Sequence, residues 1–185
     1  MIKRKFFKPR WIDKDKILYA GGIIITDNVR GEDGIWTIME YDNNTLVHTD
    51  IGGRYEYNDG DVFATIVREL REELYNCAEV SYKTLKGLPS RSKVYISGTK
   101  KNPIYLSIIV SAQDIGLKDV LSKINIKSAR EEIIRHNPEI SPFRYKTIDL
   151  RFISFKDIKN KKCIMSRRLG EIIIESFLLE NIRSA

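Results

Sequence analysis

The feature that most restricts the fold is an apolar, β-rich run near the start of the chain, ILYAGGIIIT over residues 17–26. An apolar run of this kind is typical of a strand that is buried on both faces of its sheet. A turn-rich break over 28–34 separates it from IWTIMEY, residues 35–41, which is predicted to return as a hairpin partner. Residues 45–51 form a short extended approach to Gly52 and Gly53.

The remaining elements alternate less regularly. The pattern predicts a helix over about 62–74, strands over 80–85, 93–96 and 104–112, a short helix or loop over 117–124, a helix over 128–136, a strand over 145–155 and a helix over 166–182. Ser128 is the candidate N-cap of its helix, because Glu131 follows at the capping-box spacing. Several strands, one helix, more strands and then helices indicate an α/β (α+β) fold without regular βαβ winding.

Length and composition predict one domain preceded by a basic arm. The 185 residues suit a basic N-terminal arm over 1–16 and a single domain over 17–185. Two distant cysteines, Cys77 and Cys163, argue against a zinc site or a disulfide scaffold and fit a reducing compartment such as the cytoplasm. We find no secretory signal and no run long enough to span a membrane.

A net charge of +7 has two readings that the sequence leaves open. It suits a polyanion such as RNA, or it is a solvated surface without a binding role. The positive residues gather in the arm and in the runs 91–101 and 156–168. If they form one surface, it would contact a nucleic-acid backbone.

The helix over 62–74 carries two different faces. Asp61 stands where an N-cap is expected. Four apolar side chains fall on one side at helical spacing, namely Phe63, Val67, Leu70 and Leu74. Glu69, Glu72 and Glu73 fall together on another side, and Arg68 lies four residues before Glu72.

The crowded carboxylates indicate a cation. Like charges at these spacings destabilise a helix, and Arg68 offsets only part of the repulsion. A hard divalent cation such as Mg²⁺, or Mn²⁺ in its place, prefers oxygen ligands of this type. The glycine pair Gly52–Gly53 lets the backbone approach and present a carbonyl to the same ion. An exposed charged helix face is the alternative, but the preceding glycines and the flanking strands favour the metal site.

This segment resembles the Nudix box, a glycine-opened loop and helix written G-x5-E-x7-R-E-U-x-E-E-x-G-U, where U is a bulky apolar residue. The helix positions fit at Arg68, Glu69, Leu70, Glu72 and Glu73. Gly53 fits the opening glycine with one extra loop residue, and the acid in the middle of the box falls on Gly60, so that Asp59 or Asp61 stands in. The last glycine and apolar positions are taken by Tyr75 and Asn76.

The resemblance implies a mixed β-sheet sandwiched between helices and a magnesium-dependent hydrolase. Glu69, Glu72, Glu73 and the carbonyl of Gly52 would hold the metal, Glu69 would also contact the attacking water, and Arg68 would orient them. Many members use a further acid from a later loop, for which the candidates are Glu131, Glu132 and Glu139.

The implied reaction is hydrolysis of a phosphoanhydride bond in a nucleoside diphosphate linked to another group. Substrates within the resemblance are nucleoside triphosphates, ADP-ribose, dinucleoside polyphosphates and the 5′ end of capped RNA. The basic charge favours an RNA end. The alternatives are a small-nucleotide pyrophosphohydrolase and a non-catalytic nucleotide- or RNA-binding module on the same fold. The oligomeric state is not indicated.

Overall fold

Strand β2 (Ala20–Val29) lies at the centre of the fold in the computed structural model, which describes residues 5–7, 20–88, 93–98, 103–139 and 145–175. One edge of β2 pairs in parallel with β7 (Pro103–Ser111). The other edge pairs antiparallel with β5 (Ile51–Arg54) near its start and with β3 (Glu32–Asp42) near its end. The predicted hairpin of the first two long strands is therefore confirmed.

The other strands extend this mixed sheet in two directions. Beyond β7 lie β6 (Lys93–Gly98) and then β1 (Lys5–Phe7), so that part of the basic arm pairs with the sheet. At the other end, β3 pairs with β8 (Asp149–Ser154) and with β4 (Thr45–Thr49). The described strands form one eight-stranded sheet.

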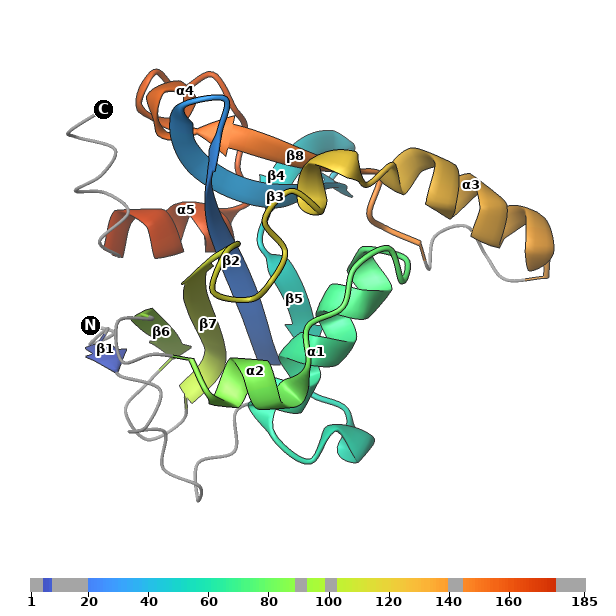
Figure 1. Cartoon of the computed structure of the whole chain (residues 1–185), viewed down its shortest axis with the longest axis horizontal. Helices are drawn as coiled ribbons and strands as arrows, with labels where there is room; N and C mark the ends of the chain where they lie inside the picture. Colours follow the sequence, from blue (N-terminus) through green and yellow to red (C-terminus); the bar gives the residue numbers. More distant parts are fainter. Residues whose placement is uncertain (1–4, 8–19, 89–92, 99–102, 140–144, 176–185) are drawn as a thin grey trace.

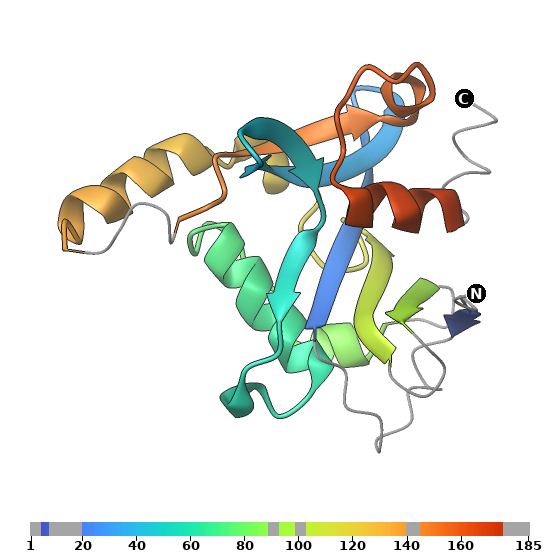
Figure 2. The same ribbon diagram turned by 180° about the vertical axis from the view of Figure 1, so that it is seen from behind.

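Helices cover both faces of β2. Ile23 and Ile25 pack into a core with α1 (Val62–Glu73), whereas Ile24 packs into a second core with α5 (Arg167–Glu175). Figures 1 and 2 show α1 and α2 (Tyr82–Lys86) on one side of the sheet and α5 on the other. The predicted burial of this strand on both faces, and the mixed sheet between helices, are confirmed.

Two local predictions were wrong because capping residues override the apolar pattern. Residues 80–85 were predicted as a strand, but Ser81 accepts a hydrogen bond from the amide of Thr84 at 3.0 Å and begins helix α2, which buries Leu85. Helix α3 (Ile126–His136) begins earlier than predicted, because Asn125 is its N-cap in place of Ser128.

The C-terminal third differs in the extent of its elements. The strand predicted over 145–155 is a ladder strand only from Asp149 to Ser154, and the next residues form a short helix, α4 (Phe155–Lys159). The segment 117–124 was predicted as a short helix or a loop, and within it Leu121–Lys123 forms a 3-10 turn. The last predicted helix is present as α5, and its part beyond residue 175 lies outside the described residues. In the described part of the chain, no helix has the length and apolar character needed to cross a membrane.

Candidate active site

The acidic face is built on α1, whose local sequence determines where it begins. The Asp61 carboxylate accepts hydrogen bonds from the amides of Phe63 and Ala64, both at 3.0 Å, as predicted for its N-cap. Phe63, Leu70 and Leu74 are buried, and Val67 packs at the edge of the same core, so the predicted apolar face is confirmed. Burial of that face turns the side chains of Arg68 and its acidic neighbours away from the core.

Arg68 joins the acids of the site through its guanidinium. Its Nη1 donates to Glu69 Oε1 and to Glu72 Oε2, each at 2.9 Å, and its Nη2 donates to the carbonyl oxygen of Arg54 at 2.7 Å. Burial lowers the pKa of Arg68, but hydrogen bonds to Asp59 and the charges of Glu69 and Glu72 outweigh it, so the pKa lies above its usual value. Arg68 thus holds two helix carboxylates and the strand end of β5 together.

Asp59, in the 3-10 turn Tyr57–Asp59 before α1, is the second partner of the guanidinium. Its carboxylate binds Arg68 Nε at 2.9 Å and Nη2 at 3.1 Å, and it accepts from the hydroxyl of Thr65 and the amide of Glu56. Burial raises its pKa, yet these hydrogen bonds leave the pKa below its usual value. Of the two acids that could stand in for the middle acid of the box, Asp59 contacts Arg68 and Asp61 caps the helix.

Glu69 occupies a space that a glycine leaves open. A Cβ atom on Gly53 would lie 2.2–2.4 Å from all three heavy atoms of the Glu69 carboxylate group. Glu69 is almost buried, and burial raises its pKa although the charge of Arg68 lowers it. The glycine of β5 therefore lets a helix carboxylate lie directly against strand backbone.

Glu73 is the most perturbed acid of the helix. Burial and, next, the charge of Glu40 raise its pKa to about 8. The hydroxyl of Thr147 donates a hydrogen bond to its carboxylate. Glu72, in contrast, is 55% exposed. The three predicted helix acids thus lie on one face, but in three different environments.

Behind the glycine pair lies a buried ion pair that the sequence did not point to. The wholly buried Asp50 carboxylate accepts from Arg168 Nε at 2.7 Å and from the Tyr105 hydroxyl at 2.6 Å. A Cβ on Gly52 would lie 2.6 Å from that same hydroxyl. Gly52 pairs with Gly22 of β2, so bare backbone separates this network from the acidic face.

The acids predicted from later loops are all exposed side chains. Glu131 and Glu132 are exposed on α3, which projects from the body of the molecule (Figure 1), and Glu139 is exposed just beyond that helix. The sequence did not point to Glu40, Thr147 or Arg168. Each lies far from the box in sequence, and the only signal was the position of Glu40 at the end of a predicted strand.

The donor set fits a hard divalent cation by its chemistry. Glu69 and Glu72 both reach one guanidinium nitrogen, Glu73 lies on the same face, and all offer carboxylate oxygens. Within the described residues, no three acidic, histidine or cysteine side chains are already gathered as a metal-ion cluster. A cation would therefore compete with Arg68 for the oxygens of Glu69 and Glu72.

Comparison with known proteins finds similarity in structure only. Neither a protein-family profile nor a curated protein sequence matches the chain. A C. elegans Ap4A hydrolase aligns in a binary complex with 12% identity and a TM-score of 0.43, over 89% of this chain and 99% of that one. A second structure of C. elegans Ap4A hydrolase aligns with 11% identity and a TM-score of 0.41, over 91% and 98%. A mutT/nudix family protein from Listeria innocua aligns with 12% identity and a TM-score of 0.43, over 92% and 99%.

These solved structures are what the chain is similar to along most of its length. At 11–12% identity, the likeness concerns the path of the chain and assigns no residue its role. What the site does must come from its own side chains.

Proposed function

We propose that the chain is a Nudix-type hydrolase that cuts a phosphoanhydride bond in a nucleoside diphosphate linked to another group, with Mg²⁺ or Mn²⁺. The observation that carries the proposal is the convergence of Glu69 and Glu72 on one nitrogen of Arg68, beside the space left by Gly53. Carboxylates held this closely at a backbone cradle suit a site for a divalent cation and a phosphate group.

The proposed roles follow from the contacts of each residue. Glu69, Glu72, Glu73 and the carbonyl of Gly52 would hold the metal, which when bound polarises the phosphate and lowers the pKa of water. Glu69 is the least exposed of the three helix acids, and its carboxylate lies against Gly53. This position suits it to orient the attacking water. Arg68 fixes the directions of Glu69 and Glu72 and is a positioning residue.

The class of substrate has two candidates. The charge of +7 favours the 5′ end of capped RNA, because a basic surface adds contacts to a nucleic-acid backbone. A small nucleotide, such as a nucleoside triphosphate, ADP-ribose or dinucleoside polyphosphate, needs only the site itself.

Both cysteines are free thiols, which supports the proposal of a reducing compartment such as the cytoplasm.

A nucleotide panel with product chromatography tests the reaction. The chain is expected to release phosphate-containing products from at least one nucleoside diphosphate derivative with Mg²⁺, and to lose this activity with a chelator. A non-catalytic binding module would bind a nucleotide without turnover under both conditions. Absence of both binding and turnover across the panel would contradict the proposal.

A further inference from the structure

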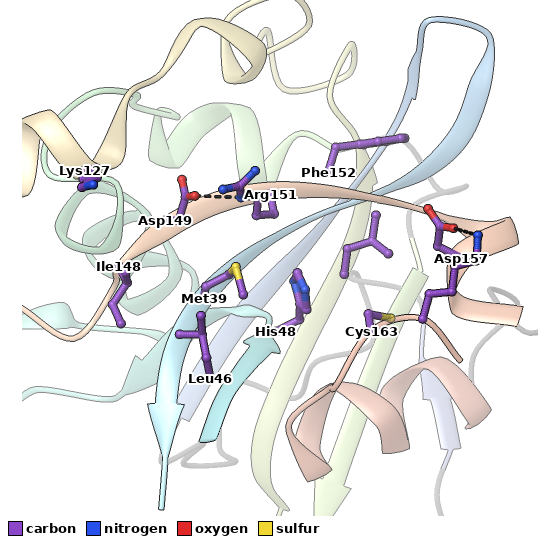
Figure 3. A pocket seen from close by; sticks show the side chains of 12 residues that line it. Met39, Leu46, His48, Lys127, Ile148, Asp149, Arg151, Phe152, Asp157 and Cys163 are labelled. Carbon is purple, nitrogen blue, oxygen red and sulfur yellow. Dashed lines mark ion pairs between the residues drawn. The ribbon is translucent and has the colours of Figure 1, made fainter. Parts of the chain in front are cut away.

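Strand β3 presents one acid, Glu40, toward the side of the sheet that α1 covers. Trp36 and Ile38, at alternate positions before it, belong to the core shared with α1. Met39 lies on the opposite face, where it lines a pocket of about 680 Å³ together with its cross-strand partner His48 (Figure 3). Because side chains alternate along a strand, Glu40 faces away from that pocket and toward α1.

Hydrogen bonds connect this part of β3 to Glu73. The amide of Ile148 donates to the carbonyl oxygen of Met39 at 2.8 Å. The preceding residue, Thr147, donates its hydroxyl hydrogen to the Glu73 carboxylate and its carbonyl accepts from the Tyr75 hydroxyl at 2.6 Å. One extended segment therefore touches both the residue before Glu40 and the carboxylate of Glu73.

The charges around Glu40 leave its carboxylate without a direct counter-ion. Arg168 and Lys146 are the cations that act on it, and Asp50 and Asp42 are the acids. In the described part of the chain, the Glu40 side chain forms neither a hydrogen bond nor a salt bridge within 4.0 Å. A half-buried carboxylate next to other carboxylates is unfavourable unless a cation joins them.

We propose that Glu40 is a further acidic ligand of the divalent metal, supplied by strand β3 opposite Glu73. This inference rests on the proposed function. Glu40 takes the part for which the sequence suggested a later-loop acid, and it does so from a strand whose face packs against α1. A mere counter-charge to Arg168 is the competing role, and it would give Glu40 no influence on metal affinity.

Metal binding without substrate separates the two roles. Mn²⁺ titration followed by electron paramagnetic resonance is expected to show at least about tenfold weaker binding in Glu40→Gln than in the parent chain. Glu32→Gln, the same change at the exposed start of the same strand, is the matched control and keeps the parent affinity. Glu40→Asp, which keeps the charge on a shorter stem, should bind with intermediate affinity and serves if the glutamine variant does not fold.

The outcomes distinguish this inference from the proposed function. Parent-like Mn²⁺ affinity in Glu40→Gln, with the parent chain hydrolysing a nucleotide, would overturn the Glu40 assignment alone. Mn²⁺ binding by the parent chain that weakens in Glu40→Gln, with no nucleotide hydrolysed by either, would support Glu40 and overturn the proposed hydrolysis. The rise in melting temperature on adding Mn²⁺, measured for each variant against its own metal-free form, gives a second readout of affinity.

Discussion

The guanidinium of Arg68 binds the carboxylate of Asp59 through two parallel hydrogen bonds, Nε to Oδ1 at 2.9 Å and Nη2 to Oδ2 at 3.1 Å. The Asp59 side chain is only 5% exposed and that of Arg68 only 15%. A two-point contact of this kind fixes the guanidinium plane, so that Nη1 is left to hold Glu69 and Glu72.

Arg68→Ala should lower both stability and activity. It leaves the buried Asp59 carboxylate without its cation, at a cost of about 3 kcal/mol in the free energy of unfolding. Arg68→Lys should recover only part of each, because lysine keeps the charge but lacks the planar fork. Chemical denaturation and kcat/KM measure the two effects, and a lysine variant equal to the parent in both would remove the positioning role.

Glu73→Gln should lower turnover by at least about a hundredfold, because it removes a proposed metal ligand. Folding should survive, because the metal-free folded chain keeps Glu73 protonated up to about pH 8, and glutamine is neutral and of similar shape. Glu79→Gln, at an exposed position beyond the helix, is the control and should keep parent turnover. Turnover of Glu73→Gln close to the parent at saturating Mg²⁺ and substrate would contradict the site.

The metal-free protein should lose stability as pH rises from about 4.5 to about 8. The folded-state pKa of Glu73 is raised to about 8 by burial and by Glu40, so the folded chain holds a proton there that the unfolded chain has released. Unfolding free energies measured across this range should therefore fall with pH, and Glu73→Gln should flatten the slope. Unchanged slopes in the two proteins would mean that Glu73 titrates normally.

Gly53→Ala should damage activity more than stability. The new methyl group would lie within 2.4 Å of the Glu69 carboxylate, whose flexible end must move, and such a displacement costs about a hundredfold in rate. Gly170→Ala is the matched control, because a Cβ there meets no atom within 4 Å. It should keep activity and add about 0.5–1 kcal/mol of stability as a helical site. Melting curves and kcat separate the two variants.

RNA binding, if the basic residues serve it, should depend steeply on salt. The log–log slope should be about −0.7 for each phosphate contact, and hydrolysis of capped RNA should exceed that of the free cap dinucleotide only at low salt. Changing Lys3, Arg4, Lys5 and Lys8 to alanine should remove that advantage and spare small-nucleotide hydrolysis. The charge-matched control changes four exposed cations elsewhere, Lys118, Lys123, Lys127 and Arg135. An advantage for RNA that neither salt nor the first variant reduces would exclude this surface.

Several structural features that depend on residues close together in the sequence were predicted correctly. Helix α1 was predicted to within one residue at its end, because Asp61 and the apolar spacing act within a few residues of each other. The contact of Arg68 with Glu72 follows from their spacing of four positions on one helix. Helix α2 was missed because a short apolar segment satisfies both periodicities, and only the cap at Ser81 decides between them.

Contacts between distant residues were not predictable in the same way. The choice between Asp59 and Asp61 depends on the course of a loop, which brings Asp59 back onto Arg68 nine positions later. The hydrogen bond of Thr147 to Glu73 spans 74 positions and depends on how β8 joins β3. The charge of Glu40 acts on Glu73 because β3 and α1 share one core, an arrangement that no pattern of neighbouring residues specifies.

The hydrogen bond between Arg168 and Asp50 joins positions that are 118 residues apart, so the two residues are synthesised at different times during translation. Asp50, the glycine pair and the whole of α1 leave the ribosome long before Arg168 is made. Until then the Asp50 carboxylate lacks its cationic partner, and its complete burial is unfavourable. A nascent chain can therefore contain every acid of α1 while the ion pair between Asp50 and Arg168, behind Gly52, has not yet formed. We therefore expect the network behind Gly52 to be completed late in translation, once α5 has been made.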